Sequence, residues 1–173
     1  MKIIYCGTEY SDQILEILND AVLNSTALYD YDKWSDATMQ QWFEIKKKGN
    51  FPVIGIIDES TDELLGFGTY GHFRYRQAYK YTVEISLYVH KNHRGKGLGK
   101  ILMNEIIRNA SEQKYHCLVG IIDSSNDVSI GLHKQFGFVH SGTIRETGYK
   151  FNRWLDIDIY QLLLPYPENP VRG

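Results

Sequence analysis

Apolar and polar residues follow a helical period in four segments of the chain. From Ser11 onward the apolar side chains recur every three or four residues, and Ser11 itself is in position to cap this first helix. Residues 38–48, 97–110 and 128–135 show the same period. The pattern therefore predicts helices spread over most of the chain.

Strand-like runs separate these helical segments. Residues 51–58 and 63–71 flank an acidic turn and predict an antiparallel hairpin, and residues 136–149 and 154–164 predict a closing antiparallel pair. The remaining runs are residues 2–6, 81–89 and 117–123. Strands that alternate with helices, without an internal repeat, predict one α/β or α+β domain over residues 1–173.

Composition limits the classes of partner. The chain has 173 residues with 19 basic and 21 acidic side chains, which gives a formal net charge of -2. A domain of this size can bury a core without disulfides or metals. Because no large positive field is available, we expect neither nucleic acid nor a membrane surface as a partner.

The sequence shows no signal-peptide pattern at the amino terminus and no cysteine motif. The amino terminus lacks the apolar run of a signal peptide, and no stretch approaches the roughly 20 apolar residues that span a bilayer. We therefore expect a cytoplasmic protein. Cys6 and Cys117 are expected to be small buried residues and not metal ligands. The proline-rich residues 164–173 predict a poorly ordered tail.

Residues 92–107, NHRGKGLGKILMNEII, place glycines and basic residues between a strand-like run and a helical pattern. Glycine allows close backbone approach, and a helix N-terminus favours an anion. A Walker A loop is excluded because Arg94 and Ile101 stand where it needs a glycine and a Ser or Thr. The GxGxxG fingerprint fails at Lys100 or Leu102. The remaining interpretations are another phosphate-binding loop and an ordinary strand-to-helix turn.

Arg94, Gly97 and Gly99 resemble the (Q/R)xxGx(G/A) motif with which the GNAT superfamily of N-acetyltransferases grips the pyrophosphate of acetyl-CoA. Two further segments resemble the phosphinothricin acetyltransferases and their amino-acid N-acetyltransferase relatives. TVEISLYV is similar to their catalytic strand, and NDVSIGLHKQFGF to their second CoA-contacting helix. Their GxxRxxGxKxxxWxD pattern is matched by Gly142, Arg145, Gly148, Lys150, Trp154 and Asp156.

This resemblance implies a fold and a cosubstrate. The implied GNAT fold is a mixed, mostly antiparallel twisted sheet of about seven strands, flanked by about four helices and splayed at the acetyl-CoA site. Acetyl-CoA is the implied cosubstrate, without a metal, and the family members are commonly homodimers. The implied donor-binding residues are Leu87, Tyr88, Val89, Arg94, Gly95, Lys96, Gly97, Leu98, Gly99, Lys100, Asn126 and Ser129.

The resemblance also implies catalytic roles. Glu84 matches the general-base glutamate, which accepts a proton from the attacking amine directly or through a water. From the residues alone, Glu84 could equally be a solvated carboxylate on a half-exposed strand. His133 stands where many superfamily members carry a tyrosine that protonates the departing thiolate, while a structural or substrate-lining role is open to it. No cysteine lies in a matching motif, which favours direct transfer in a ternary complex.

The acceptor pocket is implied by two segments. Arg74 and Arg76 offer guanidinium groups that suit a carboxylate or phosphinate, and Phe73 lies beside them. The resemblance implies that Thr26 and Tyr29 line a second side of the acceptor pocket. The two arginines could instead pair with surface carboxylates or border a dimer interface.

Our leading hypothesis is an acetyltransferase acting on the α-amine of a small amino acid or an analogue such as phosphinothricin or methionine sulfoximine. A second hypothesis keeps the donor but takes a protein N-terminus, a lysine or a polyamine as acceptor. A third is a non-catalytic acyl-CoA sensor, against which the presence of Glu84 speaks. A concave pocket closed by Arg74, Arg76 and Tyr29 would favour the small molecule, and an open groove a peptide.

Overall fold

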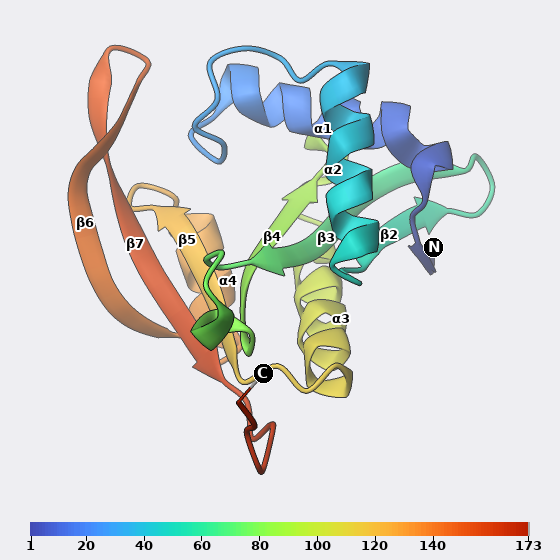
Figure 1. Cartoon of the computed structure of the whole chain (residues 1–173). Helices are drawn as coiled ribbons and strands as arrows, with labels where there is room; N and C mark the ends of the chain where they lie inside the picture. The colour runs from blue at the N-terminus through green and yellow to red at the C-terminus, as the bar shows by residue number, and fades with distance from the viewer. Residues whose placement is uncertain (173) are drawn as a thin grey trace.

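A seven-stranded sheet forms the middle layer of the computed structural model, which describes residues 1–172 (Figure 1). The strand order is β1-β2-β3-β4-β5-β7-β6, and every neighbouring pair is antiparallel except β4 and β5. The strands are β1 (Lys2–Tyr5), β2 (Val53–Asp58), β3 (Glu63–His72), β4 (Thr82–Val89), β5 (Cys117–Asp123), β6 (Val139–Lys150) and β7 (Arg153–Leu163).

The parallel strands β4 and β5 separate after a short stretch of pairing. Their register runs from Thr82 opposite Cys117 to Glu84 opposite Val119. Beyond Glu84, β4 continues to Val89 and pairs with β3 alone. The edge of β4 that faces β5 therefore has unpaired backbone groups from this point, which confirms the predicted splay.

Helices cover both faces of the sheet. Ile14 of α1 and Met39 of α2 pack in one cluster with Phe67 of the sheet, and Ile106 of α3 packs in another with Ile85. Residues of α4 join the cluster of α3, so α1 and α2 share one face and α3 and α4 the other. The helices are α1 (Ser11–Asn24), α2 (Asp36–Lys48), α3 (Leu98–Glu112) and α4 (Asp127–Gln135), and 3-10 turns cover Thr8–Tyr10, Gln77–Tyr79 and Lys91–His93.

The predicted fold class is confirmed, but the first helix cap is wrong. Ser11 already has helical backbone angles because a 3-10 turn precedes it, and its Oγ donates to the carbonyl of Thr8 at 2.7 Å. Tyr10 is the cap residue and makes no side-chain capping bond. The second helix begins two residues earlier than predicted, at Asp36, because the Oγ of Ser35 accepts the N–H of Thr38 at 3.2 Å.

The long β6–β7 hairpin stands at one edge of the sheet and curves away from it (Figure 1). Its two-residue turn is formed by Phe151 and Asn152, both with positive φ, as in a type I′ turn. After β7, residues 165–172 form no helix or strand, although the N–H of Val171 donates to Tyr81 Oη at 3.1 Å. Residue 173 of the predicted disordered tail lies outside the described residues. Within residues 1–172, every helix is too short or too polar to cross a membrane.

Candidate active site

A cleft of about 1040 Å³ opens where β4 and β5 separate. Its walls come from the end of α1, the second half of β4, the loop into α3, the end of β5, the start of α4 and the turn of the β6–β7 hairpin. Of the residues predicted from the sequence, the cleft is lined by Thr26, Leu87, Tyr88, Val89, Arg94, Gly95, Gly97, Leu98, Gly99, Lys100, Asn126, Ser129 and His133.

Other predicted residues lie outside the lining of this cleft. Glu84 immediately precedes Ile85, which does line it. Arg74 and Arg76 are exposed in the connection between β3 and β4, and the Arg74 guanidinium lies 5.0 Å from the ring centre of Phe73. Lys96 and Tyr29 are also outside the lining. Arg74, Arg76 and Tyr29 therefore do not line this cleft.

Two glycines of the loop, Gly95 and Gly97, line the cleft and offer backbone groups to it. Gly95 and Gly97 have φ of 77° and 79°, in the left-handed region that favours glycine. A Cβ at either position would meet nothing within 4 Å, so the space beside both is open. Gly97 is the cap of α3 and makes no side-chain capping bond. The first N–H groups of α3 therefore remain available to an anion.

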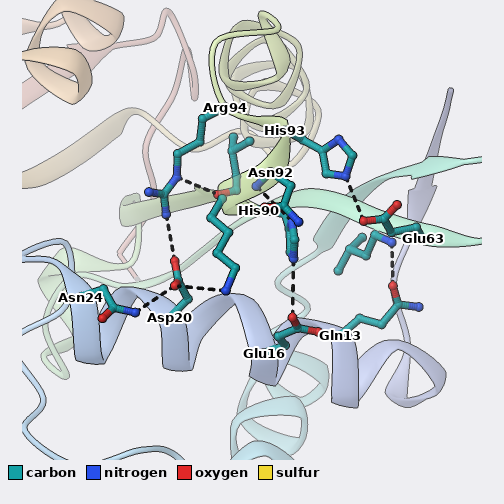
Figure 2. Close-up of polar contacts among 12 residues, drawn as sticks. Gln13, Glu16, Asp20, Asn24, Glu63, His90, Asn92, His93 and Arg94 are labelled. Atoms are coloured by element: carbon teal, nitrogen blue, oxygen red, sulfur yellow. Dashed lines mark hydrogen bonds and ion pairs between the residues drawn. The ribbon is translucent and has the colours of Figure 1, made fainter.

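Arg94 is held against α1. Its Nη2 donates to Asp20 Oδ2 at 3.1 Å, and its Nε donates to the Val89 carbonyl at 3.3 Å (Figure 2). Asp20 also accepts from Asn24 Nδ2 at 3.0 Å, and Lys91 Nζ lies 3.9 Å from it. No pattern in the sequence distinguishes Asp20, because an acidic residue on a helix is usually solvated.

The turn before the loop contains a polar cluster, shown in Figure 2. His93 Nε2 lies 2.8 Å from Glu63 Oε1, and His90 Nδ1 accepts the N–H of Asn92 at 3.3 Å. The Nδ1 of His93 also lies 3.1 Å from Lys96 Nζ. Glu63, His90 and His93 could each offer one metal-ligand atom within 4.8 Å of the others. Hydrogen bonds occupy both ring nitrogens of His93 and explain this grouping without an ion. They also draw Lys96 away from the cleft.

Glu84 is half-buried at the point where the strands separate. Burial raises the pKa of its carboxyl group, and the positive charges of Arg74 and Lys46 oppose that rise. Lys46, on α2, donates from Nζ to the Tyr70 carbonyl at 2.8 Å, and burial lowers its pKa to about 8. Sequence reasoning missed Lys46, since the last turn of a helix commonly carries exposed lysines.

His133 is buried, with only 4% of its surface exposed. Its Nδ1 lies 2.8 Å from the Ser129 carbonyl, so Nδ1 must carry the proton that makes this hydrogen bond. The ring packs so closely on Gly120 that a Cβ there would lie 2.6 Å from Nε2. Burial lowers the pKa of His133. The one N–H of the neutral ring therefore donates to the Ser129 carbonyl, and Nε2 is unprotonated.

The ends of β5 and α4 complete the cleft. Asn126 Oδ1 accepts the N–H of Ser129 at 3.1 Å and caps α4. Asp123, at the end of β5, accepts from Tyr29 Oη at 2.9 Å and from the N–H of Ser125 at 2.9 Å. Burial raises the pKa of Asp123, but these hydrogen bonds outweigh it and the net shift is downward. Tyr29 thus reaches the cleft indirectly, through Asp123.

Comparison with known proteins places this arrangement in a family. The model of the acetyltransferase (GNAT) family matches residues 14–138. The L-methionine sulfoximine/L-methionine sulfone acetyltransferase of Pseudomonas aeruginosa is 40% identical over 151 residues, which cover 87% of each chain. A solved structure from Acinetobacter baylyi ADP1 is 51% identical, with a TM-score of 0.97 over 99% of this chain and 96% of that one.

A second solved structure adds the cosubstrate of a relative. The phosphinothricin acetyltransferase of Sinorhizobium meliloti, in complex with acetyl-CoA, is 30% identical, with a TM-score of 0.94 over 99% of this chain and 94% of that one. Its fold therefore matches the sheet and helices described here. The chain belongs to the acetyltransferase (GNAT) family.

Proposed function

We propose that this protein transfers the acetyl group of acetyl-CoA to the α-amine of a small amino acid or amino-acid analogue. The observation that carries the proposal is the position of Glu84, a half-buried carboxylate at the point where β4 leaves β5 and the cleft begins. Similarity to an acetyltransferase of methionine sulfoximine and methionine sulfone supports the choice of a small amino-acid acceptor.

Acetyl-CoA would enter between the separated strands. The open space beside Gly95 and Gly97 and the N-terminus of α3 suit the pyrophosphate, with Arg94 alongside. The unpaired edge of β4 at Leu87–Val89 can bind the pantetheine arm by backbone hydrogen bonds. An N–H of this edge that points at the acetyl oxygen would stabilise the developing oxyanion.

Glu84 would act as the general base. An amino-acid ammonium must lose a proton before its nitrogen can attack the thioester, and a carboxylate accepts that proton more readily when burial raises its pKa. The amine then attacks the acetyl carbon, the C–S bond breaks, CoA leaves as a thiolate, and the new amide nitrogen releases its remaining excess proton to that thiolate or to water. The positive charges of Arg74 and Lys46 lower the pKa of Glu84 and so favour its ionised form before substrate binds.

We propose that His133 does not protonate the departing thiolate. Its N–H is engaged by Ser129, and its lowered pKa keeps the ring neutral at pH 7. Its role is to pack α4 against β5 through Gly120 and to line the cleft. The CoA thiolate, with the acidity of an ordinary thiol, can leave without a protein acid.

Transfer would be direct, without an acetyl-enzyme intermediate. Cys6 is buried, and burial raises the pKa of its thiol to about 12. Cys117 lies on β5, and burial raises its pKa as well. Neither cysteine lines the cleft, and a protonated thiol is a poor nucleophile. Both substrates would therefore occupy the cleft together.

We also propose a homodimer that forms through the β6–β7 hairpin. β6 is an edge strand, and the hairpin exposes large apolar side chains, which a monomer rarely gathers in one place. Light scattering should therefore give about twice the chain mass of 20.1 kDa, and a monomer at micromolar concentration would contradict this. The exposed side chains are Val139, Ile144, Tyr149, Trp154 and Leu163.

The function is tested by measuring thiol release from acetyl-CoA across amino acids, methionine sulfoximine, phosphinothricin, polyamines and peptides. We expect turnover with one or more amino acids or analogues, and a product whose mass has gained one acetyl group on the α-nitrogen. Turnover with polyamines or peptides alone would contradict the proposed acceptor. Binding of acetyl-CoA without turnover on any amine would contradict catalysis.

A further inference from the structure

The GxxRxxGxKxxxWxD pattern lies on β6 and β7, and the proposed chemistry does not use it. Two of its residues, Gly148 and Lys150, instead contact a segment that comprises the last turn of α1 and the residues after it. This segment, residues 22–31, contributes Asn24, Ser25, Thr26 and Ala27 to one wall of the cleft. The hairpin and this wall are distant in sequence, so their contact is a product of the fold.

Lys150 makes the central contact. It is 5% exposed, and its Nζ donates to the carbonyls of Val22 at 2.6 Å, Ser25 at 2.9 Å and Leu28 at 2.6 Å. An ammonium group has three N–H donors, so these carbonyls satisfy it completely. The Val22 carbonyl belongs to the last turn of α1, where carbonyls lack helical partners and favour a cation.

Two tyrosines of the same segment add contacts around Lys150. Tyr31 Oη donates to the Tyr149 carbonyl at 2.7 Å. The Tyr29 ring lies on Gly148, where a Cβ would come within 2.6 Å of the ring, and its Oη reaches Asp123. Gly148 and Lys150 of the pattern thus contact the segment from the hairpin, and Asp123 contacts it from the end of β5.

We propose that Lys150 is a positioning residue for the acceptor substrate. By donating to three carbonyls of residues 22–28, it fixes the position of the residues that line one side of the cleft. In the proposed function, this side of the cleft faces the acceptor amine. All three of its hydrogen bonds go to this segment, and none of them reaches Arg94, Gly95 or Gly97. Lys150 therefore makes no direct contact with the donor loop, and we expect its loss to affect the acceptor more than the donor.

Replacing Lys150 by methionine keeps the aliphatic stem and removes the ammonium. We expect Lys150→Met to raise the KM of the accepted amine on the order of tenfold, with the KM of acetyl-CoA changed by less than about twofold. Lys48→Met, at an exposed lysine in the last turn of α2, is the matched control and should change neither KM. An equal rise in both KM values, or no rise in either, would overturn the proposal.

Hydrogen–deuterium exchange provides a readout that does not depend on activity. In Lys150→Met we expect faster exchange in residues 22–31 and unchanged exchange in residues 94–100. Unchanged exchange in residues 22–31 would overturn the proposed role of Lys150, whether or not the wild-type protein acetylates any amine. Failure to acetylate any of the amines tested would contradict the proposed function separately.

A milder variant keeps the proposal testable if Lys150→Met fails to fold. Tyr31→Phe removes only the hydroxyl that donates to the Tyr149 carbonyl. We expect a smaller rise in the KM of the amine, with exchange increased around residue 31. Tyr79→Phe, at a half-exposed tyrosine outside this contact, is its control. An unchanged KM and unchanged exchange in Tyr31→Phe would overturn the proposed role of this contact region.

Discussion

The donor and acceptor sides of the cleft are built in different ways. The donor side is a contiguous loop, residues 94–99, whose properties come from the backbone angles of Gly95 and Gly97 and from the start of α3. The acceptor side joins distant residues, since Lys150 reaches Val22 across 128 positions and Tyr29 reaches Asp123 across 94. In the proposed function, a local motif thus binds a constant donor, while long-range contacts determine which amine fits.

The largest effect that separates the two sides is expected at Gly97. In Gly97→Leu a side chain would fill the open space beside the loop, and the left-handed backbone angle would be strained. We expect the KM of acetyl-CoA to rise about 100-fold, equivalent to about 3 kcal/mol of lost binding, while the KM of the amine stays within about twofold. Steady-state kinetics with each substrate varied in turn would measure both.

Gly131→Leu is the control for this substitution. Gly131 lies on α4 with open space beside it and an ordinary helical backbone, and it does not line the cleft. This variant should keep both KM values. If Gly97→Leu left the KM of acetyl-CoA unchanged, the pyrophosphate would not lie against this loop.

A smaller effect is expected at Lys46, on the acceptor side. In Lys46→Met the loss of positive charge raises the pKa of Glu84 further, so the acidic limb of kcat/KM moves to higher pH. A rise of about half a pKa unit lowers the ionised fraction of Glu84 about threefold below its pKa. Well above the pKa of Glu84 its carboxylate is ionised in both proteins, so the two profiles should converge there.

The measurement is kcat/KM for the accepted amine from about pH 6 to about pH 9. Lys47→Met, at the exposed neighbour of Lys46, is the matched control and should follow the wild-type profile. An acidic limb that stayed in place in Lys46→Met would show that Lys46 does not tune Glu84. The KM of acetyl-CoA should not change in either variant.

The residues predicted for the donor lie together in the structure because the sequence information for them is local. The glycines of the loop, the strand before it and the helix after it are neighbours in the chain, and the cleft contains nearly all of the residues predicted there. The seven strands and the flanking helices were also predictable from periodicity. The capping role assigned to Ser11 failed because an unforeseen 3-10 turn shifted the start of α1.

The acceptor side was less predictable for a physical reason. Arg74 and Arg76 attracted attention by their chemistry, but the position of a loop depends on tertiary contacts, and both side chains are exposed outside the cleft lining. Lys46 and Asp20 looked like ordinary surface charges until folding placed them near Glu84 and Arg94. No local pattern distinguishes such residues from a solvated helix face.

Glu84 is the residue on which the proposed catalysis depends most directly. In Glu84→Gln the side chain keeps its shape but cannot accept a proton, so we expect kcat/KM for the accepted amine near neutral pH to fall between about 100- and 10,000-fold. The KM of acetyl-CoA should stay close to that of the wild-type protein, because the donor side is untouched. A Glu84→Gln protein with full activity at neutral pH would contradict the proposed role of Glu84 as the base.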